Sequence, residues 1–534
     1  MKNPAPSNIN VKAAAEQEAA SRLAKFRRLL ERGTLNAEVT EKLATEAATA
    51  FLSQSRGRDT YLRDAVALLA EISTLEEPAL AEPGHRATFR LLVENLSDSF
   101  DPQQCLLYDR AFAQMITFCR KLPAAKQLDA ALQRFGLKSE RDLLERKASL
   151  RERSSGKGPV LSTDAQRKVR KALVLSRVTL GADVAVTSVV LEKARRSFPQ
   201  AERVLLGSPK LAQLFGGDST LRIRDVRYKT SGGLLDRLLG WLPVIEAVEE
   251  ETRNLAPEQF VVIDPDSRLL QLGLLPVLRP AVHEELRYFF LESRRYGEPG
   301  QGTISRITLG WLNGIFGGED EIFPAVNPRE EDRDLGMELC GKLRQGGAGF
   351  LVAASFGVGG NQSKRLPDPF EEQLLSRLLD DGCTVLLDKG VGEEERDRAD
   401  RLVERVRAGG HAVIELNQRN ARAELAAREL RCRMLTWQGE IGLFSALVAG
   451  CDEYIGYDSA GQHIAAALGV PALDIFTGSA SAVFRERWRP TGQGIVRVVA
   501  VPPSQKGPRE AGTILDEVAA LHEKIKSGAI HTEK

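Results

Sequence analysis

Residues 453–476 establish the class of fold; they read Glu453-Tyr454-Ile455-Gly456-Tyr457-Asp458-Ser459-Ala460-Gly461-Gln462-His463-Ile464-Ala465-Ala466-Ala467-Leu468-Gly469-Val470-Pro471-Ala472-Leu473-Asp474-Ile475-Phe476. The run 453–457 is short and apolar, as in a buried strand. Small residues then open a helix, which Gly469 and Pro471 bring to an end. A second apolar run over 472–476 follows at once. The stretch therefore predicts two parallel strands joined by a crossover helix.

The same alternation extends over the C-terminal part of the chain. Three further apolar runs of strand length precede the first stretch: 350–355, 383–388 and 412–416. A last helix carries Ile514, Val518, Leu521 and Ile525 on one face. We predict a doubly wound Rossmann-like domain over 346–534, with ligands at the carboxyl ends of its strands.

A second alternating series lies upstream. Apolar runs at 172–176, 203–207 and 259–264 alternate with helical segments, which predicts another Rossmann-like domain over 160–345. The expected fold class is thus α/β, with two facing Rossmann-like domains and a cleft between them. Such a cleft suits an enzyme with two substrates.

The N-terminal part differs in composition and in the spacing of its apolar residues. Residues 11–150 are rich in Ala, Leu, Glu and Arg, and apolar residues recur at helical spacing, as in Phe112, Met115, Ile116 and Cys119. Asp101 before Pro102 suits a helix N-cap. We predict an added all-α domain over 1–153, followed by a linker at 154–159. The Gly-Lys in that linker lacks the phosphate-loop pattern.

Composition excludes several classes of protein. The 534 residues carry 74 Lys plus Arg against 73 Asp plus Glu, a net charge of +1, which argues against a general nucleic-acid binder. The hydrophobic content of 43% is too high for a disordered chain, and no apolar run reaches membrane-spanning length. The six cysteines form no CxxC pair and no zinc-type spacing, so we expect buried apolar side chains. The first residues lack a secretory apolar segment, and we expect a cytoplasmic protein.

Residues 458–463 are the first candidate site. Exposed N–H groups at a helix start favour anions, and small side chains at Ser459, Ala460 and Gly461 let a phosphate approach. His463 lies one turn into the helix and can donate to a phosphate oxygen, whereas Asp458 suits a hydroxyl. The structural alternative is an aspartate N-cap with a core histidine.

Three other segments contain candidate functional residues. Lys364 lies in the glycine-rich segment 355–367 and offers a cation for a diphosphate, although, taken alone, the segment is better explained by a surface turn. Asp183 follows the strand 172–176 at the tip of a loop, where a carboxylate can take a proton from a hydroxyl; its alternative role is a helix cap. Glu393 and Glu394 follow the strand 383–388 and, unaided, are a helix N-terminal charge pair.

Residues 458–463 resemble the Asp-[Ser/Thr]-Gly-x-x-His motif of the heptosyltransferases, glycosyltransferase family nine. Two departures stand out: Ala460 holds the place of the motif glycine, which follows as Gly461, and Ala182 splits the family's Gly-Asp. Other stretches resemble the same family over roughly 171–500, namely 175–187, 355–367, 387–394, 469–471, 475–478 and 488–490, and 436–447 is similar to the family helix before the motif strand.

The resemblance implies the two-domain GT-B fold and a sugar transfer that inverts the anomeric centre. It implies Asp183 as the catalytic base. It implies Ser355, Lys364, Glu393 (on the ribose), Asp458, Ser459, Ala460, Gly461 and His463 as the residues that hold the nucleotide-sugar donor. The acceptor would be a glycan or a lipopolysaccharide-type glycolipid, and the sugar a hexose or heptose of a bacterial pathway.

No cluster with metal-ligand spacing is apparent, so we expect no metal and no cofactor. We expect no nucleic-acid partner, allow peripheral contact with the inner face of a membrane, and assign residues 1–153 to oligomerisation or partner binding. The alternatives are a nucleotide-sugar epimerase of the same fold, a non-catalytic relative that binds a nucleotide sugar or a partner protein, and a scaffold.

Overall fold

The computed structural model describes the chain from residue 8 to residue 530 with short gaps; the described ranges are 8–55, 60–154, 160–226, 228, 232–278, 284–359, 361–427, 429–478, 481–502, 504 and 507–530. The predicted linker therefore lies almost entirely outside the described residues. The chain divides into two compact units, each built from two segments. Unit 1 comprises 1–175 and 226–301, and unit 2 comprises 176–225 and 302–534.

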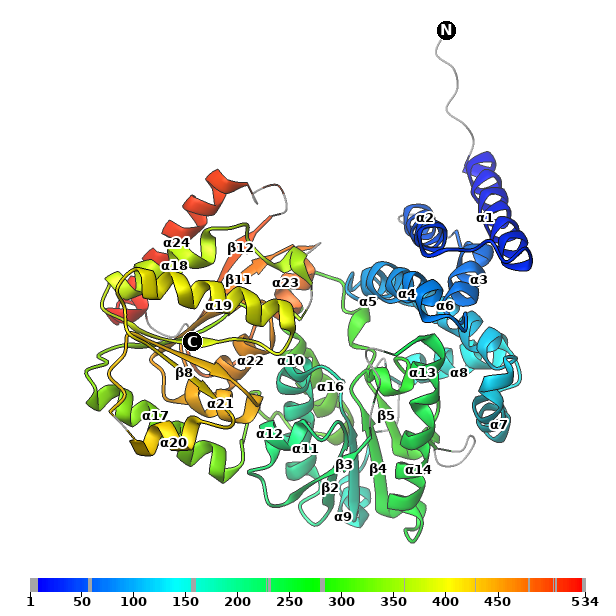
Figure 1. Ribbon diagram of the computed structural model, residues 1–534. Coiled ribbons are helices and arrows are strands. Elements are labelled where there is room, and N and C mark those ends of the chain that lie inside the picture. The colour runs from blue at the N-terminus through cyan, green and yellow to red at the C-terminus, as the bar shows by residue number, and fades with distance from the viewer. Residues whose placement is uncertain are drawn as a thin grey trace. The chain divides into compact units, whose positions relative to one another are not determined.

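The first part of unit 1 is helical, as predicted (Figure 1). Asp101 caps α6 by accepting from the Gln103 amide, and Pro102 is its first residue. The apolar stripe Phe112, Met115 and Ile116 of α6 is buried. The larger helices are α1 (Asn8–Glu31), α2 (Ala37–Ser55), α3 (Arg63–Ile72), α4 (Pro78–Arg86), α6 (Pro102–Cys119), α7 (Lys126–Arg134) and α8 (Glu140–Glu152), with a π-helix at Ala87–Val93 before α5 (Glu94–Ser97).

Unit 1 also holds three parallel strands: β1 (Lys171–Leu175), β4 (Phe260–Asp264) and β5 (Tyr288–Phe290). In the register, Leu173 pairs with Val262, and Val262 pairs with Tyr288. The helices α9 (Thr163–Lys168), α13 (Leu234–Leu239), α14 (Trp241–Thr252) and α15 (Glu284–Arg287) belong to the same unit. The strand β5 was not predicted, because three aromatic residues after a helix give too short a pattern.

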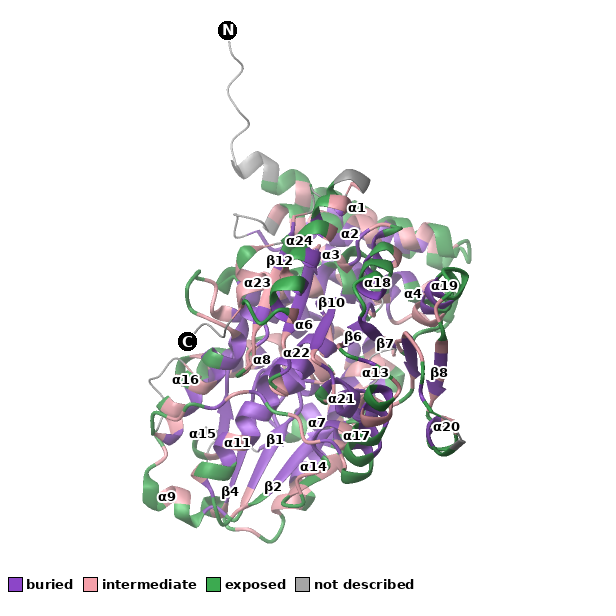
Figure 2. Ribbon diagram, turned by 90° about the vertical axis from the view of Figure 1, so that its left-hand side faces the viewer, coloured by how far each residue is buried: buried purple, intermediate pink, exposed green. Residues whose placement is uncertain are grey.

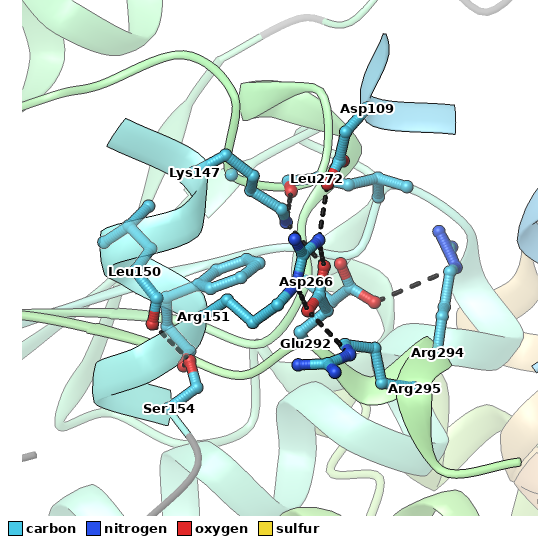
Figure 3. A network of polar contacts seen from close by, with 12 residues as sticks. Asp109, Lys147, Leu150, Arg151, Ser154, Asp266, Leu272, Glu292, Arg294 and Arg295 are labelled. Atoms are coloured by element: carbon cyan, nitrogen blue, oxygen red, sulfur yellow. Dashed lines mark hydrogen bonds and ion pairs between the residues drawn. The ribbon is translucent and has the colours of Figure 1, made fainter. Parts of the chain in front are cut away.

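A buried ionic network fastens the helices of unit 1 to the loop that follows β5 (Figure 3). Arg151 of α8 pairs with Glu292 through two hydrogen bonds of 2.6 and 2.7 Å and with Asp109 of α6 at 2.5 Å. Lys147 Nζ lies 3.1 Å from Glu292. Burial raises the pKa of Asp109 to about 6, while Lys147 and Arg151 outweigh burial and lower the pKa of Glu292. The attraction between paired buried charges offsets the free-energy cost of removing each charge from water.

Unit 2 contains two groups of strands. The parallel pair β2 (Glu202–Gly207) and β3 (Leu221–Asp225) belongs to a five-stranded sheet, and a seven-stranded parallel sheet has the order β12-β11-β10-β6-β7-β9-β8. The seven strands are β6 (Leu351–Ser355), β7 (Thr384–Asp388), β8 (Val413–Asn417), β9 (Met434–Gln438), β10 (Glu453–Tyr457), β11 (Ala472–Thr477) and β12 (Val496–Val501).

Helices cover both faces of the seven-stranded sheet, which makes it doubly wound. One face packs against α18 (Phe370–Asp380), α19 (Glu393–Ala408) and α24 (Pro508–Lys526), and the other against α17 (Glu330–Gln345), α20 (Ala421–Ala427), α21 (Ile441–Ala449) and α22 (Ala460–Ala467). Figure 2 shows the inner strands β6, β7 and β10 as buried. The other α-helices of unit 2 are α10 (Leu180–Ala182), α11 (Ser188–Ser197), α12 (Leu211–Phe215), α16 (Ile304–Phe316) and α23 (Ala482–Trp488).

The structure confirms the predicted fold class, with two parallel α/β sheets and an N-terminal helical segment. The domain boundaries 1–153, 160–345 and 346–534 stay predictions. All five predicted strands of the seven-stranded sheet are present, but β9 and β12 were missed. The stretch 436–447, which resembles the family helix before the motif strand, is helical only in part, because Thr436–Gln438 complete β9 and α21 begins at Ile441. The described helices include none that is long and apolar enough to cross a membrane.

Candidate functional site

The start of α22 lies at the carboxyl end of β10, as predicted. β10 ends at Tyr457, Ser459 takes the N-cap position without a side-chain cap bond, and Ala460 is the first helical residue. Asp458 is therefore not the N-cap of this helix, so that part of the structural alternative is wrong, whereas the buried position of His463 agrees with its other part. The amides of the first turn remain available to an anion.

Lys364 and Asp458 meet at this helix start. Lys364 ends the short helix Gln362–Lys364, and its Nζ lies 2.7 Å from Asp458 Oδ2. The other carboxylate oxygen of Asp458 accepts from Gln462 Nε2 at 2.9 Å. The carboxylate thus holds the lysine beside the first turn of α22, which joins two residues that the sequence separates by almost a hundred positions.

His463 lies one turn into α22 and is almost wholly buried. Burial lowers its pKa to about 4, and the nearby Lys364 adds to this although Asp458 opposes it. The imidazole is therefore neutral at neutral pH and offers a single N–H. Its ring meets Trp488 edge to face at 6.0 Å, and the Arg177 guanidinium lies 5.8 Å from the same tryptophan ring. Sequence reasoning did not assign Arg177 to the site.

Asp183 is fully buried within the loop that follows β1. Its carboxylate accepts from Thr187 Oγ1 at 2.7 Å, from the Arg177 amide at 2.7 Å and from Ser176 Oγ at 2.8 Å. Burial raises its pKa to about 6 against the opposing effect of these three donors. A carboxyl with such a pKa is ionised at neutral pH but close enough to neutrality to exchange a proton.

The Asp183 loop and the start of α22 lie side by side within unit 2. A methyl group on Gly181 would lie 3.2 Å from the Ala460 Cα and 3.3 Å from the His463 Cδ2. A π-helical turn over Asp183–Thr187 follows Ala182 directly. The predicted base and the predicted phosphate-binding helix are thereby brought to one place.

Gly461 serves a packing need that the motif comparison did not reveal. A Cβ at this position would lie 2.3 Å from the hydroxyl oxygen of Tyr454, a fully buried side chain of β10. A Cβ on Gly456 would lie 2.4 Å from the same hydroxyl. The glycine one place after Ala460 therefore lets the helix approach the tyrosine on the sheet.

We expect Gly461→Ala to destabilise the protein by about 1–3 kcal/mol, because the new methyl group overpacks a closed core. Chemical denaturation measures the change. Gly341→Ala is the matched control, since Gly341 lies inside α17 with open space around it and alanine there should stabilise by about 0.4–1 kcal/mol. Equal effects of the two substitutions would contradict this account of Gly461.

Ser355 and Glu393 are two further residues that the sequence predicted to bind the donor. Ser355 is buried at the end of β6 and donates to Asp388 Oδ2 at 3.0 Å. Glu393 is exposed at the first position of α19. It is Glu395, one position beyond the predicted charge pair, whose carboxylate accepts from the amides of Val358 and Gly359 and from that of Val391. Glu395 thus ties together the two glycine-rich segments.

Asp474 is a further buried acid that sequence reasoning passed over. It lies in β11 opposite Gly456 of β10, and neither carboxylate oxygen has a hydrogen-bond partner among the residues that the structure describes. Burial, reinforced by Asp458, raises its pKa well above the ordinary value. An aspartate inside the apolar run 472–476 was the available signal.

Residues 410–511 match the model of glycosyltransferase family 9 (heptosyltransferase). This segment contains β10, α22 and β11, so the match confirms the predicted resemblance to the heptosyltransferase-like glycosyltransferases. No curated protein matches the chain in sequence.

Several solved structures are similar to the chain at low identity. A family 9 glycosyl transferase from Veillonella parvula is 14% identical with a TM-score of 0.44, covering 68% of this chain and 90% of that one. The ADP-heptose lps heptosyltransferase II of E. coli is 14% identical with a TM-score of 0.44, covering 67% of this chain and 100% of that one. At this level of similarity the two structures carry no argument about function.

Proposed function

We propose that the protein is an inverting, metal-independent glycosyltransferase that moves a hexose or heptose from a nucleotide-diphosphate donor to a glycan or lipopolysaccharide-type acceptor. The family 9 match over 410–511 supports a glycosyltransferase with a nucleotide-sugar donor. We place its action in the cytoplasm, at the inner face of the membrane where a glycolipid acceptor is found, and we assign an oligomerisation or partner-binding role to the N-terminal helices.

Asp183 would act as the base. The acceptor hydroxyl gives its proton to the carboxylate as its oxygen attacks the anomeric carbon, and the bond from that carbon to the diphosphate oxygen breaks. Lys364 and the first-turn amides of α22 would bind the departing diphosphate, where fixed positive charge is worth most. Neutral His463 would add one N–H donor.

One observation carries this proposal: the Asp183 loop touches the first turn of α22 through Gly181. The proton acceptor and the anion-binding helix start would then act in the same sugar-transfer reaction. The carboxylate of Asp183 is buried, so acceptor binding has to open the loop. Val178 in that loop has a φ of +80°, an unfavourable value for a β-branched residue that marks stored strain.

The pKa of Asp183 predicts how activity depends on pH. The folded-state pKa is raised to about 6, so the carboxyl is protonated below that pH and cannot accept the acceptor's proton. We expect kcat/KM to rise tenfold per pH unit below about pH 6 and to level off above it. The measurement is a pH profile of transfer between pH 4.5 and 8.5. A profile that stays flat through pH 5 would contradict Asp183 as the base.

A thermal-shift screen of nucleoside diphosphates and their sugars tests the donor. A ligand present at 100 times its Kd should stabilise the folded protein by about 2.7 kcal/mol. Transfer and donor hydrolysis are then assayed with the stabilising sugar, with EDTA in a parallel sample. Loss of turnover in EDTA at an unchanged melting temperature would contradict metal independence. An epimerase would convert the donor without any acceptor.

The closed hydrogen bonding of Asp183 favours a second candidate, a relative that binds a nucleotide sugar without transferring it. Among the described residues, the carboxylate accepts from Ser176, Arg177 and Thr187 of its own segment, 176–187, as a purely structural aspartate would. Asp183→Asn separates the two. An enzyme would keep donor binding and lose transfer, whereas a binder would show no transfer in either form.

A further inference from the structure

Two thiols meet within unit 2, where α17 packs against the end of α21. Cys340 lies on α17, and Cys451 is the second residue after α21. Both sulfur atoms donate to one carbonyl oxygen, that of Leu447, at 3.5 and 3.3 Å. A hydrogen bond also joins the two thiols to each other. More than a hundred positions separate them in the sequence, so the fold alone brings them together.

The backbone on both sides of this contact is closely packed. A Cβ on Gly336, one turn before Cys340, would lie 2.6 Å from the Cβ of Ala446. A Cβ on Gly450 would lie 2.5 Å from the Sγ of Cys340 and 2.7 Å from its Cβ. The Cβ atoms of a disulfide are about 3.5–4.5 Å apart. Because Cys451 directly follows Gly450, this approach brings its side chain within reach of Cys340 without movement of either helix.

We propose that Cys340 and Cys451 are a site of reversible oxidative modification, a dithiol that hydrogen peroxide converts into a disulfide. The sulfur of Cys340 attacks a peroxide oxygen, the O–O bond breaks, and one water leaves, which gives a sulfenic acid. The sulfur of Cys451 then attacks Cys340, the S–O bond breaks, and a second water leaves. The two thiols lose two protons and two electrons in total, and the peroxide is reduced to two waters. A dithiol reductant reverses the change.

A cation beside the pair supplies an independent observation. The Arg344 guanidinium, one turn after Cys340 on α17, donates to the Gly450 carbonyl oxygen at 3.1 Å and to Asp452 Oδ1 at 2.9 Å, on either side of Cys451. The hydrogen bond from Cys451 lowers the pKa of the Cys340 thiol, and Arg344 adds to this while burial and Asp452 oppose it. Since the thiolate is the nucleophile, Cys340 is the attacking sulfur and Cys451 the one that resolves the sulfenic acid.

The surroundings of the pair differ from those of the cysteines in unit 1. Burial raises the pKa of Cys119 to about 12, and burial also raises that of Cys105, so both stay protonated thiols. Cys340 and Cys451 keep 4% and 8% of their surface exposed, and the Arg344 side chain beside them is 39% exposed. Solvent therefore borders the pair, as access by a molecule of the size of peroxide requires. Low pKa, solvent access and a neighbouring thiol are the features of cysteines that sense oxidants.

The disulfide would fasten α17 to the start of β10, the strand that leads to α22. It would close a loop of more than a hundred residues, which restricts the unfolded chain, so we expect the oxidised protein to melt at a higher temperature than the reduced protein. The inference does not depend on the proposed function, because it concerns the opposite end of the strand from the candidate site.

Thiol counting and peptide mapping of the full chain test the site. The folded, reduced protein is treated with hydrogen peroxide, unfolded, alkylated with iodoacetamide and digested without reduction. We expect four of the six cysteines to be alkylated, and mass spectrometry to find one peptide pair linked through Cys340 and Cys451. Dithiothreitol added before alkylation should restore all six. Six alkylated cysteines after peroxide treatment would overturn the proposal, and so would a linked pair that joins other cysteines.

Matched variants assign the two roles. Cys451→Ser removes the resolving thiol, so the sulfenic acid on Cys340 should persist and be trapped by dimedone. Arg344→Gln removes the neighbouring cation and should slow formation of the disulfide. Cys119→Ser removes a buried cysteine elsewhere and should leave the rate and the linked peptides unchanged. A Cys451→Ser protein that folds but gives no dimedone adduct on Cys340 would contradict Cys340 as the attacking sulfur.

Discussion

Replacing Lys364 by alanine is expected to lower kcat by about 10²–10³-fold, the cost of removing one fixed group that stabilises charge in the transition state. The lysine is held 2.7 Å from Asp458 at the start of α22, so its ammonium is already in place when the diphosphate departs. Steady-state transfer kinetics with the donor found by thermal shift measure the loss.

Two variants make the Lys364 result specific. Lys364→Arg keeps the positive charge and should recover part of the rate, although the planar guanidinium does not reproduce the point charge of lysine. Lys168→Ala removes an exposed lysine from the end of α9 and should leave kcat unchanged. Full activity of Lys364→Ala, with the fold intact, would remove the lysine from the mechanism.

Arg151→Ala should destabilise the protein by about 3–5 kcal/mol, because breaking a buried ion pair leaves its partners as unpaired buried charges. Arg151 pairs with both Asp109 and Glu292, and all three side chains are largely buried. Lys147 still pairs with Glu292 in this variant, so the lost stability comes mostly from the buried charge of Asp109, which is left without Arg151. Denaturant unfolding of unit 1 reports the change.

Arg141→Ala is the control on the same helix. Arg141 pairs with Glu145 at 2.6 Å, but both side chains are exposed and solvent screens the pair. Its removal should leave the unfolding midpoint unchanged. If both arginines had equally small effects, the network of Figure 3 would not hold the helices α6 and α8 to the loop after β5.

The sequence predicted the doubly wound sheet well because buried parallel strands are short, continuous and apolar. The strand β12 has exposed and partly exposed positions between its buried ones, so its pattern is weaker. β9 was missed for a different reason. The residues before it, 429–433, are mostly charged or polar, and no glycine or proline marks where the run begins.

Only part of the candidate site could be predicted from the sequence. The strand end at Tyr457 and the small residues after it predict an anion-binding helix start, since that geometry is local. The Lys364–Asp458 pair, the tie between Glu395 and the glycine segments, and the neutral state of His463 depend on residues far away in the chain. No local pattern carries that information.

The sequence by itself determined the alternation of strands and helices, the helical N-terminal segment and the family resemblance of 410–511. Those features follow from periodicity, glycine and proline positions and short motifs, which are properties of neighbouring residues. Only the tertiary structure decided which charges meet: Arg151 with Glu292, and Lys364 with Asp458. Burial then set their protonation and strength, because desolvation depends on the packed whole and not on the order of residues.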